Sequence, residues 1–130
     1  LLVRGACSLV PQVQGLSENI RVFSIVDKYL EHSRIYYFEH SNVMYLSSAD
    51  WMPRNFFSRL EIAFPVRDKR IFEQLRDIIL PTYINDNVKA WELQSSGRWI
   101  RKTPRASEPK LRAQVFFEAM AAYGIDSYES

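Results

Sequence analysis

Cysteine, histidine and long apolar runs are scarce in this chain, and each shortage excludes a class of protein. The one cysteine, Cys7, cannot form an internal disulfide or a cysteine-based zinc site, and its apolar neighbours predict a buried thiol. No stretch approaches the roughly 18 apolar residues that span a bilayer, and no secretory signal is visible. The chain opens without methionine, within a predicted strand, so we expect a fragment of a longer polypeptide.

The common phosphate-binding loops and metal clusters are missing as well. There is no GxxxxGK[ST] loop and no GxGxxG turn, so a nucleotide would be held without those loops. The two histidines, His32 and His40, lie on opposite sides of a predicted strand, and no carboxylate pair has convincing ligand spacing. We therefore expect no metal ligands in this chain.

Composition leaves the function open. A chain of 130 residues with 47% hydrophobic and 25% charged residues is typical of one globular domain or part of one. The net charge of +2 gives little direction. Five arginines favour either a local funnel for anions or a scatter of solvated charges: Arg4, Arg21, Arg34, Arg54 and Arg59.

The stretch from Tyr29 to Asn55 carries most of the chemistry. His32 and Arg34 precede an aromatic strand over 35–38, and Ser47-Ser48-Ala49-Asp50 follows its predicted hairpin partner over 43–46. In an antiparallel hairpin those two points lie side by side. Imidazole, guanidinium and hydroxyl groups gathered there suit a phosphoryl group.

The residue pattern predicts an α/β fold, a mixed β-sheet with packed helices. A helix over 71–80 begins at Asp68 as its N-cap; Pro81 is expected to kink or interrupt it, with a looser extension over 82–86. A polar linker over 103–109 leads to a terminal helix over 108–123, stopped by Gly124 and followed by a frayed end. The apolar face of that helix is expected to comprise Leu111, Val115, Phe116 and Ala119. Further strands are expected over 1–3, 22–26, 60–66, 88–93 and 98–101.

The central stretch resembles one half of a phospholipase-D-type site, which reads His-x-Lys, four residues, Asp, then Gly-Ser-x-Asn. His32 fits this pattern, Arg34 stands for the lysine, and Glu39 stands for the aspartate. The segment Ser47–Asp50 stands for the last motif, after a spacer one residue longer. These departures make the chain a poor match to a hydrolase.

A more specific resemblance is to the C-terminal part of the bacterial long-chain polyphosphate kinase. The matching words occur in the family's order over roughly the first 100 residues. They are VRGACSL, GLSENIR, SIVDKYLEHSRIYYFE, YLSSADWMPRN and DNVKAWEL. The resemblance implies a phospholipase-D-like half domain over 1–130, part of the catalytic core.

The resemblance also implies reversible transfer of the γ-phosphoryl group of ATP to inorganic polyphosphate. The phosphorylated histidine would lie in a preceding domain, outside this chain. His32 would be catalytic and would bind nucleotide phosphates together with Arg4. Seven residues would line the polyphosphate path or support the site: Arg21, Arg34, Ser47, Ser48, Asp50, Arg54 and Asn55. One of the arginines is expected to pair with Asp50, Glu39 or Glu61.

Expected partners are ATP or ADP, polyphosphate, the remaining domains of the same polypeptide, and a second copy in a homo-oligomer. Mg²⁺ is implied, with its ligands outside this chain, and no nucleic acid is expected. The location implied is cytoplasmic, or peripheral at the inner membrane. Two alternatives stay open: a phospholipase-D-type phosphodiesterase or phosphatidyl transferase, and a non-catalytic polyanion-binding module.

Overall fold

A computed structural model describes residues 1–5 and 7–124, so the expected frayed end over 125–130 lies outside the described residues. The predicted α/β fold is confirmed, with the strands forming two separate antiparallel sheets in place of one mixed sheet. The chain divides into two compact units. Unit 1 combines residues 1–31 with the segment from residue 81 onward, and unit 2 comprises residues 32–80.

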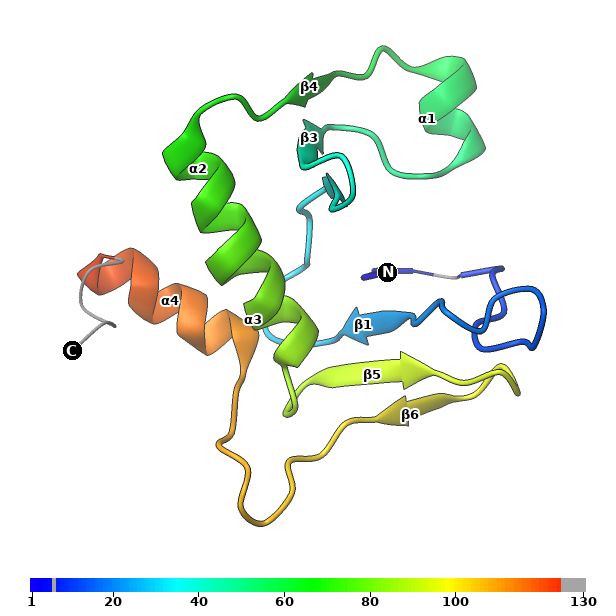
Figure 1. Ribbon diagram of the computed structural model, residues 1–130, viewed down its shortest axis with the longest axis vertical. Helices are drawn as coiled ribbons and strands as arrows, with labels where there is room; N and C mark the ends of the chain where they lie inside the picture. Colours follow the sequence, from blue (N-terminus) through cyan, green and yellow to red (C-terminus); the bar gives the residue numbers. More distant parts are fainter. Residues whose placement is uncertain (6, 125–130) are drawn as a thin grey trace. The chain divides into compact units, whose positions relative to one another are not determined.

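Unit 1 contains a three-stranded antiparallel sheet, in the order β1 (Phe23–Ile25), β5 (Ala90–Leu93), β6 (Trp99–Arg101) (Figure 1). The predicted hairpin of the last two strands is confirmed, and its turn places Gly97 at φ 80°, a conformation that glycine adopts without a steric cost. The expected first strand is reduced to a single parallel bridge between Leu2 and Phe23.

The core of unit 1 joins this sheet to the terminal helix, α4 (Ala113–Tyr123). Ile25, Ala90 and Ala113 are buried together, and the rings of Tyr83 and Phe117 pack against them with centroids 4.8 Å apart. Gly124 caps the helix as predicted, donating its N–H to the Met120 carbonyl.

The predicted start and apolar face of the terminal helix are corrected. The helix begins at Ala113 rather than at Glu108, so Leu111 precedes it. Val115, expected on the apolar face, is 46% exposed, whereas Phe117 packs on the core. The physical reason is that the helix begins where a distant buried carboxylate accepts its first N–H, which no local residue signals.

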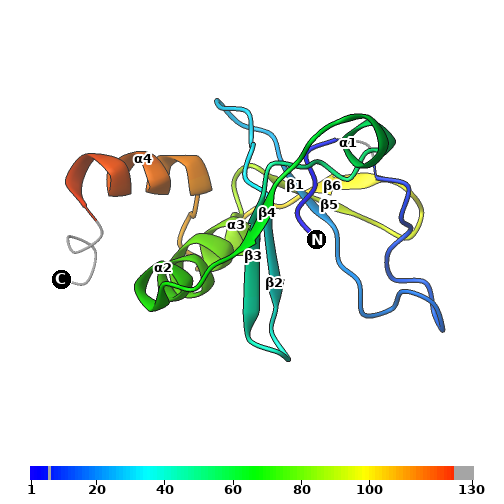
Figure 2. The same ribbon diagram turned by 90° about the horizontal axis from the view of Figure 1, so that it is seen from above.

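Unit 2 is built on the predicted hairpin of β2 (Ile35–Phe38) and β3 (Val43–Ser47), to which β4 (Ala63–Pro65) adds a third antiparallel strand (Figure 2). Asn42 adopts φ 50° in the turn, a conformation that asparagine tolerates better than most residues. The register pairs Ile35 with Leu46, which brings the residues before β2 beside those after β3.

One short helix was not predicted. The six residues of α1 (Pro53–Ser58) are too few to show helical periodicity, although proline near a first turn is a start signal. Several large apolar side chains of this region are exposed, including Phe57 at 86% and Trp51 at 78%.

A continuous helical run links β4 to β5. Its parts are α2 (Lys69–Gln74), a π-helical turn (Leu75–Ile79) and α3 (Leu80–Asn85). Asp68 is the N-cap, as predicted, and accepts a bond from the Ile71 N–H. Pro81 does not interrupt the helix, and the predicted extension beyond it is confirmed as far as Asn85. The wider turn before Pro81 gives the proline ring room beside the preceding carbonyls.

Candidate functional site

The hairpin of unit 2 brings His32, Arg34 and Asp50 together. Arg34 donates from Nε to Asp50 Oδ1 at 3.0 Å, and its Nη2 lies 2.9 Å from the same oxygen in an ion pair. Its Nη1 donates to the His32 carbonyl at 2.9 Å. The Arg34 carbonyl in turn accepts the Ser47 N–H, which locks the two ends of the hairpin side by side. The predicted pairing of one arginine with Asp50 is therefore confirmed, and Arg34 is that arginine.

The guanidinium of Arg34 also lies against the imidazole of His32. Its Nη1 and Nη2 are 3.0 and 3.2 Å from the two ring nitrogens, Nδ1 and Nε2. A neutral imidazole has one accepting nitrogen and one N–H donor. At most one of these contacts can therefore be a hydrogen bond, and a ring N–H is left to donate to another group. The His32 residue is exposed, so that group can come from solvent.

The serines and the asparagine of the predicted set serve the local structure. Ser47 Oγ accepts the Ala49 N–H at 3.0 Å. Ser48 Oγ donates to Glu61 and accepts the Ile62 N–H, and Nδ2 of the buried Asn55 donates to the other Glu61 oxygen at 2.6 Å. These bonds hold the segment after β3, α1 and the approach to β4 together.

Glu61 is the residue that sequence reasoning undervalued at this site. The hydrogen bond from Ser48, followed by that from Asn55, holds the pKa of Glu61 below its ordinary value, and the nearby charge of Arg59 acts in the same direction. A carboxylate kept ionised repels a phosphate. Ser48 and Asn55 are thus placed to support the backbone rather than to bind an anion themselves. The Oδ1 atom of Asn55 is buried without a hydrogen-bond partner among the described residues.

Trp51 lies beside this cluster and is largely exposed. Its indole N–H donates to the Tyr36 hydroxyl at 2.9 Å, and that hydroxyl donates to the Ala49 carbonyl at 3.2 Å. Its ring meets that of Phe56 edge to face. Tyr36 was not singled out from the sequence, although its place on β2 beside the segment 47–50 follows from the hairpin register.

Arg4 and Arg21 belong to unit 1. Arg4 is exposed and its Nη1 lies 3.4 Å from the Glu31 carbonyl oxygen. Arg21 donates to Glu92 on β5 at 2.9 Å, and its guanidinium lies 4.8 Å from the centre of the Phe23 ring. The guanidinium of Arg21 is therefore engaged with the sheet of its own unit.

The remaining predicted residues are spread over unit 2. Arg54 is exposed on α1, and Arg59 follows that helix at its C-cap. Glu39 lies in the turn of the β2–β3 hairpin, at the opposite end from Arg34, and His40 is exposed beside it. Four residues of strand, about 13 Å, separate Glu39 from the cluster around His32. The structure thus brings together part of the phospholipase-D-like pattern and leaves Glu39 outside it.

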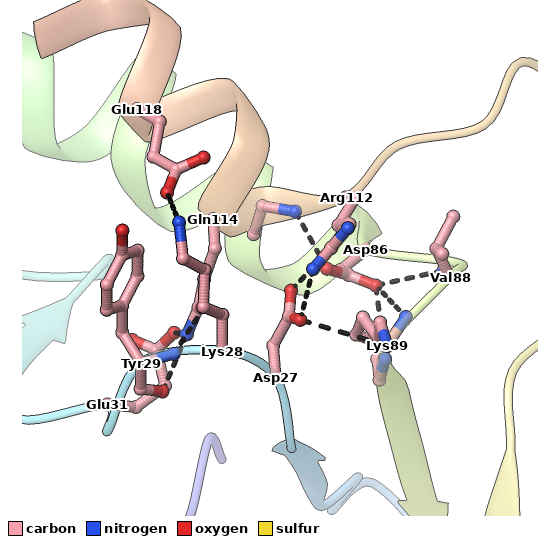
Figure 3. A network of polar contacts seen from close by, with 12 residues as sticks. Asp27, Lys28, Tyr29, Glu31, Asp86, Val88, Lys89, Arg112, Gln114 and Glu118 are labelled. Carbon is pink, nitrogen blue, oxygen red and sulfur yellow. Dashed lines mark hydrogen bonds and ion pairs between the residues drawn. The ribbon is translucent and has the colours of Figure 1, made fainter.

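A second group of polar residues, in unit 1, was missed. Asp86, which is fully buried, accepts from the N–H groups of Val88, Lys89 and Ala90 through Oδ1, at 2.7 to 3.1 Å. Its Oδ2 accepts the first N–H of α4, from Ala113, at 2.8 Å (Figure 3). Asp86 directly follows α3, and aspartate is a common turn residue. That position was the one sequence signal that could have marked it as a structural residue.

Asp27 completes this group. Its carboxylate accepts two hydrogen bonds from Arg112, at 2.8 and 2.6 Å, and Lys89 lies 3.8 Å away. The Asp27 side chain is 1% exposed. The bonds from Arg112 lower the pKa of Asp27 despite this burial, which alone would raise it. The side chain is therefore a buried, ionised anchor between the end of β1 and the start of α4.

The described residues hold neither a cluster of metal ligands nor a membrane-spanning helix. Among residues 1–5 and 7–124, no three histidine, cysteine, aspartate or glutamate side chains gather as a ligand set for a metal ion. The Mg²⁺ implied by the resemblance is thus not matched by a ligand set in the described part of the chain. No helix in the described ranges is long and apolar enough to cross a membrane.

The described residues thus form an α/β domain in which an imidazole, a guanidinium and a carboxylate lie together at the end of one hairpin. Residues 1–114 match the sequence model of the polyphosphate kinase C-terminal domain 2. The chain belongs to that family.

Relatives and a solved structure agree with this assignment. The polyphosphate kinase of Helicobacter pylori strain 26695 is 51% identical over 121 residues, which are 93% of this chain and 17% of that protein. The polyphosphate kinase of Paraburkholderia phytofirmans is 50% identical over 109 residues, 82% of this chain and 16% of that protein. The crystal structure of polyphosphate kinase from Porphyromonas gingivalis matches with a TM-score of 0.83 and 40% identity, covering 95% of this chain and 19% of that one. The chain thus spans about a sixth to a fifth of the length of these relatives.

Proposed function

We propose that this chain is one domain of a polyphosphate kinase that reversibly transfers the γ-phosphoryl group of ATP to inorganic polyphosphate. The observation that carries the proposal is the family match over residues 1–114, together with relatives of about 50% identity that are named polyphosphate kinase. Because the chain spans only a small share of those relatives, the complete reaction belongs to the longer polypeptide. The phosphorylated histidine would lie in that remainder.

Within this reaction, His32 would act on the transferring phosphoryl group. Its exposed ring carries an N–H that Arg34 cannot accept, since a guanidinium has only donors. That N–H can donate to a phosphoryl oxygen as negative charge develops there. Arg34 would act mainly as support, because Asp50 and the His32 carbonyl occupy its donors.

Arg4 would bind the phosphates of the nucleotide. It is an exposed guanidinium, and guanidinium groups bind phosphate oxygens through paired hydrogen bonds. Exposed arginines such as Arg54 and Arg59 would attract the polyanion over a longer range. Mg²⁺, when bound by other parts of the polypeptide, would neutralise phosphate charge.

The test uses the full-length protein that carries this chain. ATP-dependent synthesis of polyphosphate is measured for the wild type, His32→Ala and Arg4→Ala, with folding checked by circular dichroism. We expect a loss of about a hundredfold in each folded variant, the usual cost of removing a donor to the transition state. His40→Ala, at the exposed turn of the same hairpin, is the matched control and should retain activity. Near-normal synthesis by both variants would refute the assigned roles, and phosphodiester cleavage without synthesis would refute the reaction.

A further inference from the structure

The first turns of α4 hold the segment that runs from the end of β1 to Glu31. Arg112 binds Asp27, and Glu118 binds Lys28 at 2.8 Å. The amide of Gln114 pairs with the backbone of Tyr29, accepting its N–H and donating to its carbonyl, each at 2.8 Å. Figure 3 shows these side chains reaching from one helix to consecutive residues of the segment. Gln114 and Tyr29 are 85 residues apart in the chain.

Glu31 is where these contacts end and where three separate parts of unit 1 meet. One carboxylate oxygen accepts from Gln114 Nε2 at 2.7 Å, and the other accepts from the Tyr83 hydroxyl at 2.8 Å. Its backbone carbonyl lies 3.4 Å from Nη1 of Arg4. Gln114 is buried and both of its amide hydrogens are used, so its side chain cannot rotate without breaking these bonds.

The carbonyl that faces Arg4 belongs to the peptide bond between Glu31 and His32. A peptide group is planar, so the orientation of that carbonyl also fixes the N–H of His32. The Glu31 side chain therefore constrains a peptide group that contacts Arg4 and that leads directly into His32, the two residues proposed to act on phosphates.

We propose that Glu31, held by Gln114 and Tyr83, is a positioning residue for phosphoryl transfer. It orients the peptide group that Arg4 contacts and that begins the segment carrying His32. The inference rests on the proposed function, because it assigns a purpose to the geometry only if Arg4 and His32 act in the reaction. A bidentate carboxylate suits this task because two fixed donors leave it one orientation.

The test measures kcat, the KM for ATP and the melting temperature of the full-length protein. Glu31→Ala should lower kcat about tenfold, since the lost contacts are hydrogen bonds to a charged group. Glu31→Gln should keep most of the activity, because it retains one acceptor and the Tyr83 hydroxyl can turn to accept from the new amide. Glu118→Gln is the matched control: it removes the negative charge from another contact between the same helix and segment without touching Glu31, and kcat should stay unchanged.

A cycle with Arg4→Ala separates positioning from a general loss of structure. If Glu31 acts through Arg4, Glu31→Ala should cost much less in the Arg4→Ala background than in the wild type. If the fold-losses in kcat of the two single variants multiply in the double variant, the inference is overturned. It is also overturned if Glu118→Gln loses as much kcat as Glu31→Ala. If Glu31→Ala fails to fold, Tyr83→Phe removes one of the two donors and should lower kcat about two- to fivefold; an unchanged kcat would refute the inference.

The outcomes also distinguish this inference from the proposed function. Full activity of Arg4→Ala and His32→Ala would refute the roles on which it rests, and the inference would fall with them. A large loss in Arg4→Ala with normal kcat in Glu31→Ala would refute the positioning role alone.

Discussion

Replacing Asp86 tests whether one buried carboxylate holds both the start of β5 and the start of α4. The carboxylate accepts four backbone N–H bonds, from Val88, Lys89, Ala90 and Ala113, and the residue is fully buried. Arg112, the N-cap residue of α4, forms no side-chain capping bond, so Asp86 supplies the cap from a distant part of the chain. Removing the carboxylate leaves four N–H donors without their partner, of which those of Ala90 and Ala113 are buried and those of Val88 and Lys89 partly buried.

The expected magnitude follows from these contacts. A hydrogen bond to a charged group contributes about 1.5–3 kcal/mol, and such contributions within one network are not additive. We expect Asp86→Ala to lower the local opening free energy by about 3–5 kcal/mol, a hundred- to several-thousandfold loss of protection. Asp86→Asn keeps an acceptor for the amides that follow it but turns an amide group toward the Ala113 N–H. Its cost should be about 1–3 kcal/mol.

Hydrogen exchange in the full-length protein is the suitable assay, because it reports local opening where global unfolding of a multidomain protein is not two-state. Peptides covering 87–91 and 112–116 should both lose protection, more in Asp86→Ala than in Asp86→Asn. Asp77→Asn, which changes an exposed carboxylate paired with its neighbour Arg76, is the control and should leave both peptides unchanged. Unchanged protection at Ala113 in Asp86→Ala would refute the capping role.

Two further predictions concern ion pairs. The pKa of Asp27 lies below its ordinary value of 3.8 because Arg112 donates to it, so the unfolded chain binds more protons as pH falls through this window. The melting-temperature difference between wild type and Asp27→Asn should be constant above about pH 5 and shrink below pH 3.8; a difference that grows in acid would contradict the pairing. Arg34→Lys keeps the charge but cannot hold Asp50 and the His32 carbonyl in the same geometry, so synthesis of polyphosphate should fall about tenfold or more. Lys69→Arg at an exposed pair on α2 should have no such effect, and full activity of Arg34→Lys would show that charge alone suffices.

Local signals in the sequence were enough to predict the elements whose partners are close in the chain. The hairpin of β2 and β3 follows from an aromatic, β-branched pattern around a short polar turn, and its register places Arg34 beside Asp50. Asp68 as an N-cap and Gly124 as a stop were likewise readable, since each acts within one helical turn. The matching family words, read from the sequence, pointed to the family to which the chain belongs.

Other features were decided only by the tertiary structure. The start of α4 depends on Asp86, which is 27 residues away, and the placement of Glu31 depends on Gln114, which is 83 residues away. No local pattern encodes such pairs, because a buried polar group is stable only where distant segments supply its hydrogen-bond partners. The hydrogen bonds from Ser48 and Asn55 to Glu61 could not be predicted from the sequence for the same reason. The sequence alone therefore determined the hairpin strands, the caps at Asp68 and Gly124, and the chemistry available at the hairpin of unit 2. Long-range burial decided which polar groups are structural anchors and which remain exposed to act.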